Sequence, residues 1–251
     1  MMRFRQLSTT RVVAMALGVA LATTALAGCG APPGQPVAGS ETIAPNEISD
    51  FETLYSQNCS GCHGAQGKGG AAFAVADPVY LAIADDATIR KVVTGGVRGT
   101  AMSAFAVSAG GMLTDKQIDI ITTQIRARWS HPGDLSSANL PSYAPKTAGN
   151  TAQGETVYKT FCESCHGAEG RGGPKGSAIT GDSFLALISD QGLRTVVITG
   201  RPELGAPDFR GNVPGKPMSD QEITDVVAWL AAHRVKNPGG PYPVSHDAQH
   251  N

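Results

Sequence analysis

Two short segments of the sequence carry the residue types best suited to chemistry, and both have the same spacing. They read Cys59-x-x-Cys62-His63 and Cys162-x-x-Cys165-His166. Thiols at positions i and i+3 lie close to one helical turn apart, so both can reach the same edge of a porphyrin and add across its vinyl groups. The adjacent histidine then points at the iron and binds it from one face. Each segment therefore predicts one covalently bound haem c, with His63 and His166 as iron ligands.

Other chemistry at a Cys-x-x-Cys pair stays open at this point. A structural zinc site would need two further ligands per pair. The remaining histidines do not recur at matching positions: His131, His233, His246 and His250. A thioredoxin-like redox site would need a βαβ pattern around the motif, and the sequence shows none. Two structural disulfides would leave the matching histidines without a role, so haem attachment is the interpretation that uses every residue of both motifs.

The positions around the motifs indicate that the chain is an internal duplication. The motifs start 103 residues apart, and Tyr55 and Tyr158 each stand four residues before the first cysteine in matching Glu-Thr-x-Tyr segments. Downstream, the segment Arg90–Gly95 resembles Arg194–Gly200, with one residue inserted in the second copy. Self-similarity at this spacing, without a third copy, predicts a tandem pair of domains with one fold.

Each half closes with the pattern of an amphipathic helix. Thr114 with Gln117, and Ser219 with Glu222, have the spacing of a capping box, in which side chains satisfy backbone N–H groups at a helix start. Apolar residues then recur at helical spacing: Ile118, Ile121 and Ile125 in the first half, and Ile223, Val226, Val227 and Leu230 in the second. Convincing period-two strands are missing, so the sequence predicts an all-α fold in both domains.

Composition and connectors divide the rest of the chain. We expect domains at residues 46–130 and 150–236, a linker at 131–149 that contains three prolines, and a polar tail at 237–251. The chain has 20 Lys plus Arg against 21 Asp plus Glu. Such a balance gives no electrostatic reason to expect a nucleic acid partner.

The N-terminal 28 residues have the pattern of an export signal. Three arginines precede an uncharged, apolar region at residues 12–27, which is shorter than the about 20 residues of a membrane-spanning helix. The sequence Leu-Ala-Gly-Cys29 resembles the lipobox of bacterial lipoproteins, whose cysteine is acylated. The resemblance implies an exported chain that faces the periplasm, anchored to the membrane through Cys29, with residues 29–45 as a flexible tether. Gly30, where an inner-membrane lipoprotein would have Asp, favours the outer membrane slightly.

With these features together, each half resembles a class I cytochrome c domain. The features are the Cys-x-x-Cys-His motif, the CHGAxGxGG run that contains it, and the amphipathic closing helix. The tandem, over residues 46–130 and 150–236, resembles the di-haem cytochromes c of bacteria, here as a lipoprotein. The resemblance implies a helical wrap around each haem and transfer of single electrons between membrane-bound or periplasmic partners. An oxidase, a dehydrogenase or another cytochrome would be such a partner, and the chain would be an electron carrier or subunit, not an enzyme.

The two halves differ at the second iron ligand that this resemblance implies. Met102 lies in the loop before the closing helix and resembles the family's distal methionine, so we expect it to bind the first iron. Aligning the phenylalanines that follow places Ala206 at the matching position. The second haem would then have Met218, His233 or no side chain as its sixth ligand, and Met218 corresponds more nearly to Met112. An open second iron underlies the alternative function, a di-haem peroxidase or a ligand-binding cytochrome.

Overall fold

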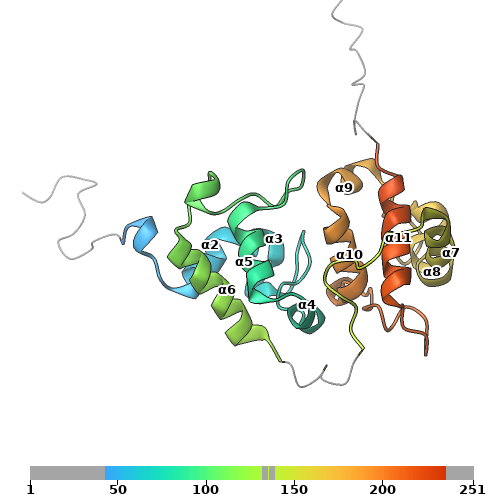
Figure 1. The fold of residues 1–251 in the computed structure, drawn as a ribbon, viewed down its shortest axis with the longest axis horizontal. Helices are drawn as coiled ribbons and strands as arrows, with labels where there is room; N and C mark the ends of the chain where they lie inside the picture. Colours follow the sequence, from blue (N-terminus) through green and yellow to red (C-terminus); the bar gives the residue numbers. More distant parts are fainter. Residues whose placement is uncertain (1–42, 132–134, 136–138, 236–251) are drawn as a thin grey trace, which may run out of the picture. The chain divides into compact units, whose positions relative to one another are not determined.

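The computed structural model describes residues 43–131, 135 and 139–235 (Figure 1). Within these ranges the chain forms helices and turns, and its β-bridges, Ala106 with Leu113 and Arg201 with Ala206, are isolated pairs. The prediction of an all-α fold is therefore confirmed. No helix in these ranges is both long enough and apolar enough to cross a bilayer.

The first domain is built from five α-helices in its described part. They are α2 (Phe51–Asn58), α3 (Ser60–His63), α4 (Pro78–Ile83), α5 (Asp86–Gly95) and α6 (Asp115–Trp129). Short 3-10 turns lie at Pro45–Glu47, Ala65–Gly67 and Val107–Ala109. Helices α2 and α6 pack against each other, and Ile118, Ile121 and Ile125 of α6 are buried as their spacing predicts.

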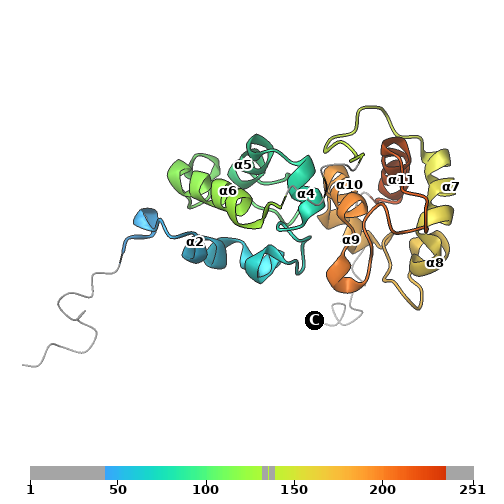
Figure 2. The same ribbon diagram turned by 90° about the horizontal axis from the view of Figure 1, so that it is seen from below.

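The second domain repeats this order of helices. They are α7 (Thr151–Phe161), α8 (Glu163–His166), α9 (Asp182–Leu187), α10 (Asp190–Thr199) and α11 (Asp220–Ala232), with 3-10 turns at Ala168–Gly170 and Pro202–Leu204. Figure 2 shows α7 and α11 side by side, as they also are in Figure 1. The predicted face of α11 is buried in the core of this domain: Ile223, Val226, Val227 and Leu230.

Both closing helices start at the capping boxes that the sequence predicts. In α6 the Gln117 amide donates to the Thr114 hydroxyl at 3.3 Å, and the Thr114 amide donates back to the Gln117 side chain at 3.0 Å. In α11 the Ser219 amide donates to the Glu222 carboxylate at 2.8 Å, and the Glu222 amide donates to the Ser219 hydroxyl at 3.2 Å. Two N–H groups that the helix itself cannot satisfy are bonded in each case, which fixes where the helix begins.

The helices that flank each motif meet by different packing in the two domains. At Gly154 of α7, a Cβ atom would lie 2.1 Å from the Asp225 carbonyl oxygen of α11, so the two backbones are in direct contact. Both domains add aromatic contacts between these helices: Tyr158 of α7 stacks on Trp229 of α11 with centroids 4.3 Å apart, and Phe51 of α2 meets Trp129 of α6 edge to face at 5.6 Å. The backbone contact at Gly154 is thus added to an aromatic contact in the second domain.

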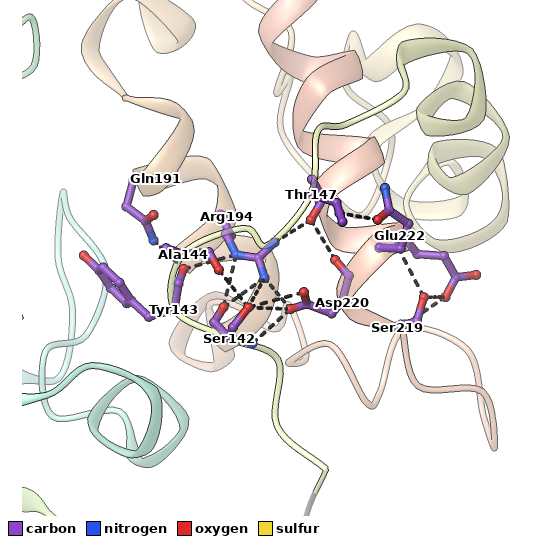
Figure 3. Close-up of polar contacts among 11 residues, drawn as sticks. Ser142, Tyr143, Ala144, Thr147, Gln191, Arg194, Ser219, Asp220 and Glu222 are labelled. Carbon is purple, nitrogen blue, oxygen red and sulfur yellow. Dashed lines mark hydrogen bonds and ion pairs between the residues drawn. The ribbon is translucent and has the colours of Figure 1, made fainter.

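A buried arginine ties the end of the interdomain segment to the second domain. Arg194 of α10 is 1% exposed and donates to the backbone carbonyls of Ser142 and Tyr143 at 2.9 and 3.1 Å. It also bonds the Thr224 hydroxyl at 2.9 Å and pairs with the Asp220 carboxylate at 2.5 Å (Figure 3). The segment 142–148, which the sequence places in the linker, is therefore bonded to α10 through Tyr143 and to α11 through Ser142 and Ala148.

The register of the repeat differs from the sequence alignment at one point. Helices α5 and α10 each have ten residues and end at the glycines Gly96 and Gly200. Gly200 therefore matches Gly96, and the expectation of an extra residue within the second helix is wrong. An extra residue inside a helix would rotate its buried face by about 100°, whereas a loop absorbs it without such a change. One extra residue of the second copy lies before this helix, since His166 bonds Ser177 eleven positions later and His63 bonds Phe73 ten positions later. Another lies after Phe209, where nine positions separate it from Met218 and eight separate Phe105 from Leu113.

Candidate functional site

In the first domain, one turn of helix brings the two cysteines and the histidine together. Cys59 ends α2 and precedes α3, with backbone angles of φ −121° and ψ −39°. Its carbonyl accepts hydrogen bonds from the amides of Cys62 at 3.2 Å and His63 at 3.0 Å. Because the three residues share this turn, both thiols and the imidazole are presented by one short, rigid segment.

The second domain has the same turn, with nearly the same backbone angles at its first cysteine. Cys162 has φ −122° and ψ −34°, and its carbonyl accepts from the amides of Cys165 at 3.1 Å and His166 at 2.9 Å. The glycine that follows each histidine has a positive φ, 76° at Gly64 and 73° at Gly167. A positive φ favours glycine because it has no Cβ. The two motifs are therefore two copies of one structural unit.

The four cysteines of these turns are free thiols. Burial raises the pKa of Cys59 to about 11 and that of Cys162 to about 12, and the neighbouring cysteine adds to the increase. Both thiols are consequently protonated at neutral pH. Since the thiolate is the species that attacks a disulfide or an oxidant, burial protects the first cysteine of each motif from unwanted oxidation.

A backbone carbonyl holds each histidine in one tautomer. The Nδ1 atom of His63 lies 2.9 Å from the Phe73 carbonyl oxygen, and that of His166 lies 2.8 Å from the Ser177 carbonyl oxygen. A carbonyl only accepts, so Nδ1 carries the proton and Nε2 keeps a free lone pair. Burial lowers the pKa of His63 below its usual 6.5, although the bond to Phe73 opposes the shift. A neutral imidazole with Nε2 free is the form that binds a metal.

The two domains match a single protein family. Residues 46–123 and 149–230, more than half of the chain, fit the family described as cytochrome c oxidase, cbb3-type, subunit III. The chain belongs to this family. Membership of a cytochrome c family implies haem c as the cofactor, and it supports electron transfer as the function.

Curated proteins from several bacteria are similar to this chain over part or most of its length. The Cbb3-type cytochrome c oxidase subunit CcoP of Azospirillum sp. (strain B510) is 33% identical over 131 residues, which are 48% of this chain and 39% of that protein. The cytochrome bc1 complex cytochrome c subunit of Mycobacterium bovis is 25% identical over 191 residues, 74% of this chain and 64% of that protein. The corresponding subunit of Corynebacterium diphtheriae is 23% identical over 252 residues, 94% of this chain and 84% of that protein. The chain thus spans less than two thirds of the first two relatives.

The residues around both histidines fit the haem c of this cytochrome family. Each motif offers two free thiols and one Nε2 lone pair from a single turn, which is the donor set of a c-type site. Gly176 leaves room for the second imidazole, because a Cβ there would lie 2.9 Å from Nδ1 of His166. In the described ranges no three His, Cys, Asp or Glu side chains cluster as ligands of a metal ion. The four-ligand set of a structural zinc site is thus missing from that part of the chain.

The residues outside the motif that hydrogen-bond to it were not predicted from the sequence. Phe73 and Ser177 act through backbone carbonyls, which leave no trace in the residue type. Tyr55 and Tyr158 act through their hydroxyls, which donate to the carbonyls of Gly64 at 3.1 Å and Gly167 at 2.5 Å. Burial raises the pKa of Tyr158 to about 12, so its hydroxyl stays protonated and can donate. The recurrence of a tyrosine four residues before each first cysteine was the signal for this role.

The other residues that the sequence singled out lie at different places. Met102 is half-buried in the loop between α5 and α6, where its amide donates to the Thr100 hydroxyl at 3.1 Å. Met218 is buried in the core of the second domain, and His233 caps the end of α11. The expectation that Met218 matches Met112 is wrong, because its structural counterpart is Leu113. Cys29 lies outside the described residues.

Proposed function

We propose that this chain transfers single electrons through two covalently bound haem c groups, one in each domain. The observation that carries the proposal is the duplicated turn, with two free thiols and an Nε2 lone pair in both copies. When bound, haem supplies reversible one-electron chemistry at iron, which no protein side chain here could provide. An enzyme-like role would require further groups that act on a substrate, whereas an electron carrier needs only attachment, ligation and burial of the cofactor.

The protein's own residues set the attachment and the orientation. The cysteines of each turn form the covalent links, and the histidine binds the iron through Nε2. The carbonyls of Phe73 and Ser177 keep each imidazole in the correct tautomer and orientation, which strengthens it as a ligand. Gly64 and Gly167 turn the chain away immediately after the histidine. These hydrogen bonds and turns position the histidine that would bind the iron.

The number of haems is tested by removing one pair of thiols at a time. We expect the full-length protein, matured in a host that attaches haem c, to hold two haems per chain that resist acid–acetone extraction. Replacing Cys59 and Cys62 by serine should leave one haem per chain. The matched change at Cys162 and Cys165 should leave the other one. Pyridine haemochrome absorbance divided by protein concentration gives the count, and a wild-type value of one or zero would refute the proposal.

We also propose that the chain is an exported lipoprotein that works on the membrane facing the periplasm, more readily at the outer than at the inner membrane. The Leu-Ala-Gly-Cys29 sequence after an apolar segment supports this. An anchor confines the protein to the plane of its membrane-bound partners. Labelling with radioactive palmitate should mark the wild-type protein, and Cys29→Ser should remove the label and move the protein to the soluble fraction. Label that persists in the variant would contradict acylation at this cysteine.

The names of the relatives suggest the class of electron partner. Those proteins are subunits of a cbb3-type oxidase and of a cytochrome bc1 complex. By extension, we expect this chain to exchange electrons with a membrane-bound oxidase, dehydrogenase or cytochrome complex, as a mobile carrier or as a fixed subunit. Purification from mild detergent separates these cases, because a subunit remains with its complex in stoichiometric amount and a carrier does not. Fast reduction and reoxidation by isolated membranes is the result expected in both cases.

A second function, peroxide reduction or ligand binding at the second haem, is favoured by one residue, Ala206. The first domain has Met102, a side chain able to bind iron, at the equivalent position. For peroxidase action, turnover with hydrogen peroxide should be fast and should disappear in Ala206→Met. Turnover no faster than that of free haem would exclude a peroxidase and leave ligand binding.

A further inference from the structure

The loops after α5 and α10 have the same main-chain frame in both domains. The Val97 amide donates to the Met102 carbonyl at 2.8 Å, and the Arg201 amide donates to the Ala206 carbonyl at 2.9 Å. The glycine that ends the preceding helix is equally close to each loop. A Cβ at Gly96 would lie 2.6 Å from the Met102 oxygen, and one at Gly200 would lie 2.7 Å from the Ala206 oxygen. Met102 and Ala206 are therefore structural equivalents, which confirms their alignment.

The exchange of methionine for alanine removes an iron ligand. A thioether sulfur is one of the few side-chain groups that bind haem iron opposite a histidine. The methyl group of Ala206 has no donor atom, and the carboxylates nearby are engaged. Glu203 pairs with Arg201 at 2.5 Å, and Asp208 pairs with Arg210 at 2.5 Å. The loop in the second domain therefore offers no replacement from its acidic residues.

Met218 has the position and the environment of a core residue. Its amide donates to the Phe209 carbonyl at 2.9 Å, as the Leu113 amide donates to the Phe105 carbonyl at 2.7 Å. Both side chains are buried, Met218 to 2% exposure and Leu113 to 5%. A methionine at the place of a buried leucine fills the core. The thioether of Met218 is thus used in packing.

His233 lies beside the segment that holds His166 in place. The carbonyl of Ser177 accepts from Nδ1 of His166, the ring nitrogen that would not face the iron. The next residues of this segment, Ala178 and Thr180, line a pocket together with His233. The ring of His233 is further held by the Trp229 carbonyl, 2.9 Å from Nδ1. This histidine is consequently placed near the Nδ1 side of His166, and not near the Nε2 lone pair that would bind the iron.

Lys216 provides the amine of this loop. It is exposed, and its Nζ lies 4.9 Å from the centre of the Phe161 ring, a cation–π contact. The Lys216 amine is thus already engaged in a contact with α7.

From these observations we infer that the described residues of the second domain supply no side-chain ligand opposite His166, and that this position binds small neutral diatomic molecules such as carbon monoxide or nitric oxide. The inference rests on the proposed function, since it requires a haem at His166. In the first domain, Met102 and His63 would hold the haem iron between them. The two domains then divide the work, one as a pure electron-transfer centre and the other as an electron-transfer centre that can also bind a ligand.

Carbon monoxide added to the reduced, full-length protein tests the inference. We expect the optical change to account for about half of the total haem, because only one of the two haems would have an open position. Ala206→Met should abolish the change by restoring the ligand of the first domain. Met102→Ala should double it. Electron paramagnetic resonance of the oxidised protein gives an independent readout, in which Ala206→Met should convert a high-spin signal into a low-spin one.

Three variants test the residues that could replace the missing ligand. Met218→Leu copies the residue of the first domain, His233→Gln removes the imidazole, and Lys216→Gln removes the amine. All three should leave carbon monoxide binding at the wild-type level. A wild-type protein with two haems that binds no carbon monoxide would overturn the inference, and the variant that then gains binding would identify the ligand. Fewer than two haems per chain would instead contradict the proposed function, so the two failures are distinguishable.

Discussion

Replacing Arg194 by methionine removes a buried cation while keeping most of its volume. The guanidinium is fully enclosed and bonds two backbone carbonyls, a hydroxyl and the Asp220 carboxylate. Breaking a buried ion pair costs about 3–5 kcal/mol because the partner groups are left without hydrogen bonds. The side chain of Asp220 is 30% exposed and can regain water, so the lower end, about 3 kcal/mol, is expected. For a domain of this size, such a loss lowers the melting temperature by at least about 12 °C.

The equivalent arginine of the first domain provides a matched control. Arg90 pairs with Asp115 at 3.5 Å, the counterpart of Asp220, but its side chain is 36% exposed and its partner 77%. Exposed pairs contribute only about 0–1 kcal/mol, so Arg90→Met should have a small effect. Urea unfolding can be followed separately in each domain through Trp129 or Trp229, with the other tryptophan replaced by phenylalanine. Equal free energies of unfolding lost in the two arginine variants would refute the view that Arg194 organises the second domain.

Three further predictions concern packing, pH and capping. Gly154→Ala should destabilise the second domain by about 1–3 kcal/mol, because its Cβ would overlap the Asp225 carbonyl oxygen. The control Gly95→Ala, with no atom within 4 Å of its Cβ, should stabilise the first domain by about 0.4–1 kcal/mol, and similar urea midpoints for both would contradict this. Burial alone would raise the pKa of Asp220, but hydrogen bonds and a cationic partner lower it below 3.8. Its stabilising effect is thus complete above pH 3.8 and lost as pH falls through the lower folded value; Asp220→Asn should flatten this acid dependence of the free energy of unfolding. Ser219→Ala should cost about 1 kcal/mol by thermal unfolding, and an unchanged melting temperature would argue against the capping box.

Local patterns made most of the fold and the motif predictable. Capping boxes, helical periodicity and the Cys-x-x-Cys-His turn depend on residues within about one or two turns of each other, so their spacing contains the necessary information. The equivalence of Ala206 and Met102 was also predictable, because no residue is inserted between these two positions and the phenylalanines that follow them, Phe209 and Phe105. Met218 was matched to the wrong residue since an insertion after Phe209 has no sequence marker.

Contacts between distant segments were out of reach of the sequence. The burial of Arg194 depends on Ser142 and Tyr143, about fifty positions earlier in the chain, and nothing in a Pro-containing segment indicates that it packs against α10. The carbonyls that hold the histidines were likewise hidden, because any residue can supply a carbonyl. Phe73 and Ser177 share no side-chain property, yet they make the same bond.

The main-chain frame of the loop that contains Met102 or Ala206 has an evolutionary consequence. The bonds that shape the loop come from the backbone of Val97 in one copy and of Arg201 in the other, and they do not involve the side chain of Met102 or Ala206. A mutation there changes what the loop offers without changing how the chain folds. After gene duplication, one copy can keep the ancestral residue under selection while the other explores alternatives. A single codon is then enough to give two domains of one polypeptide separate tasks.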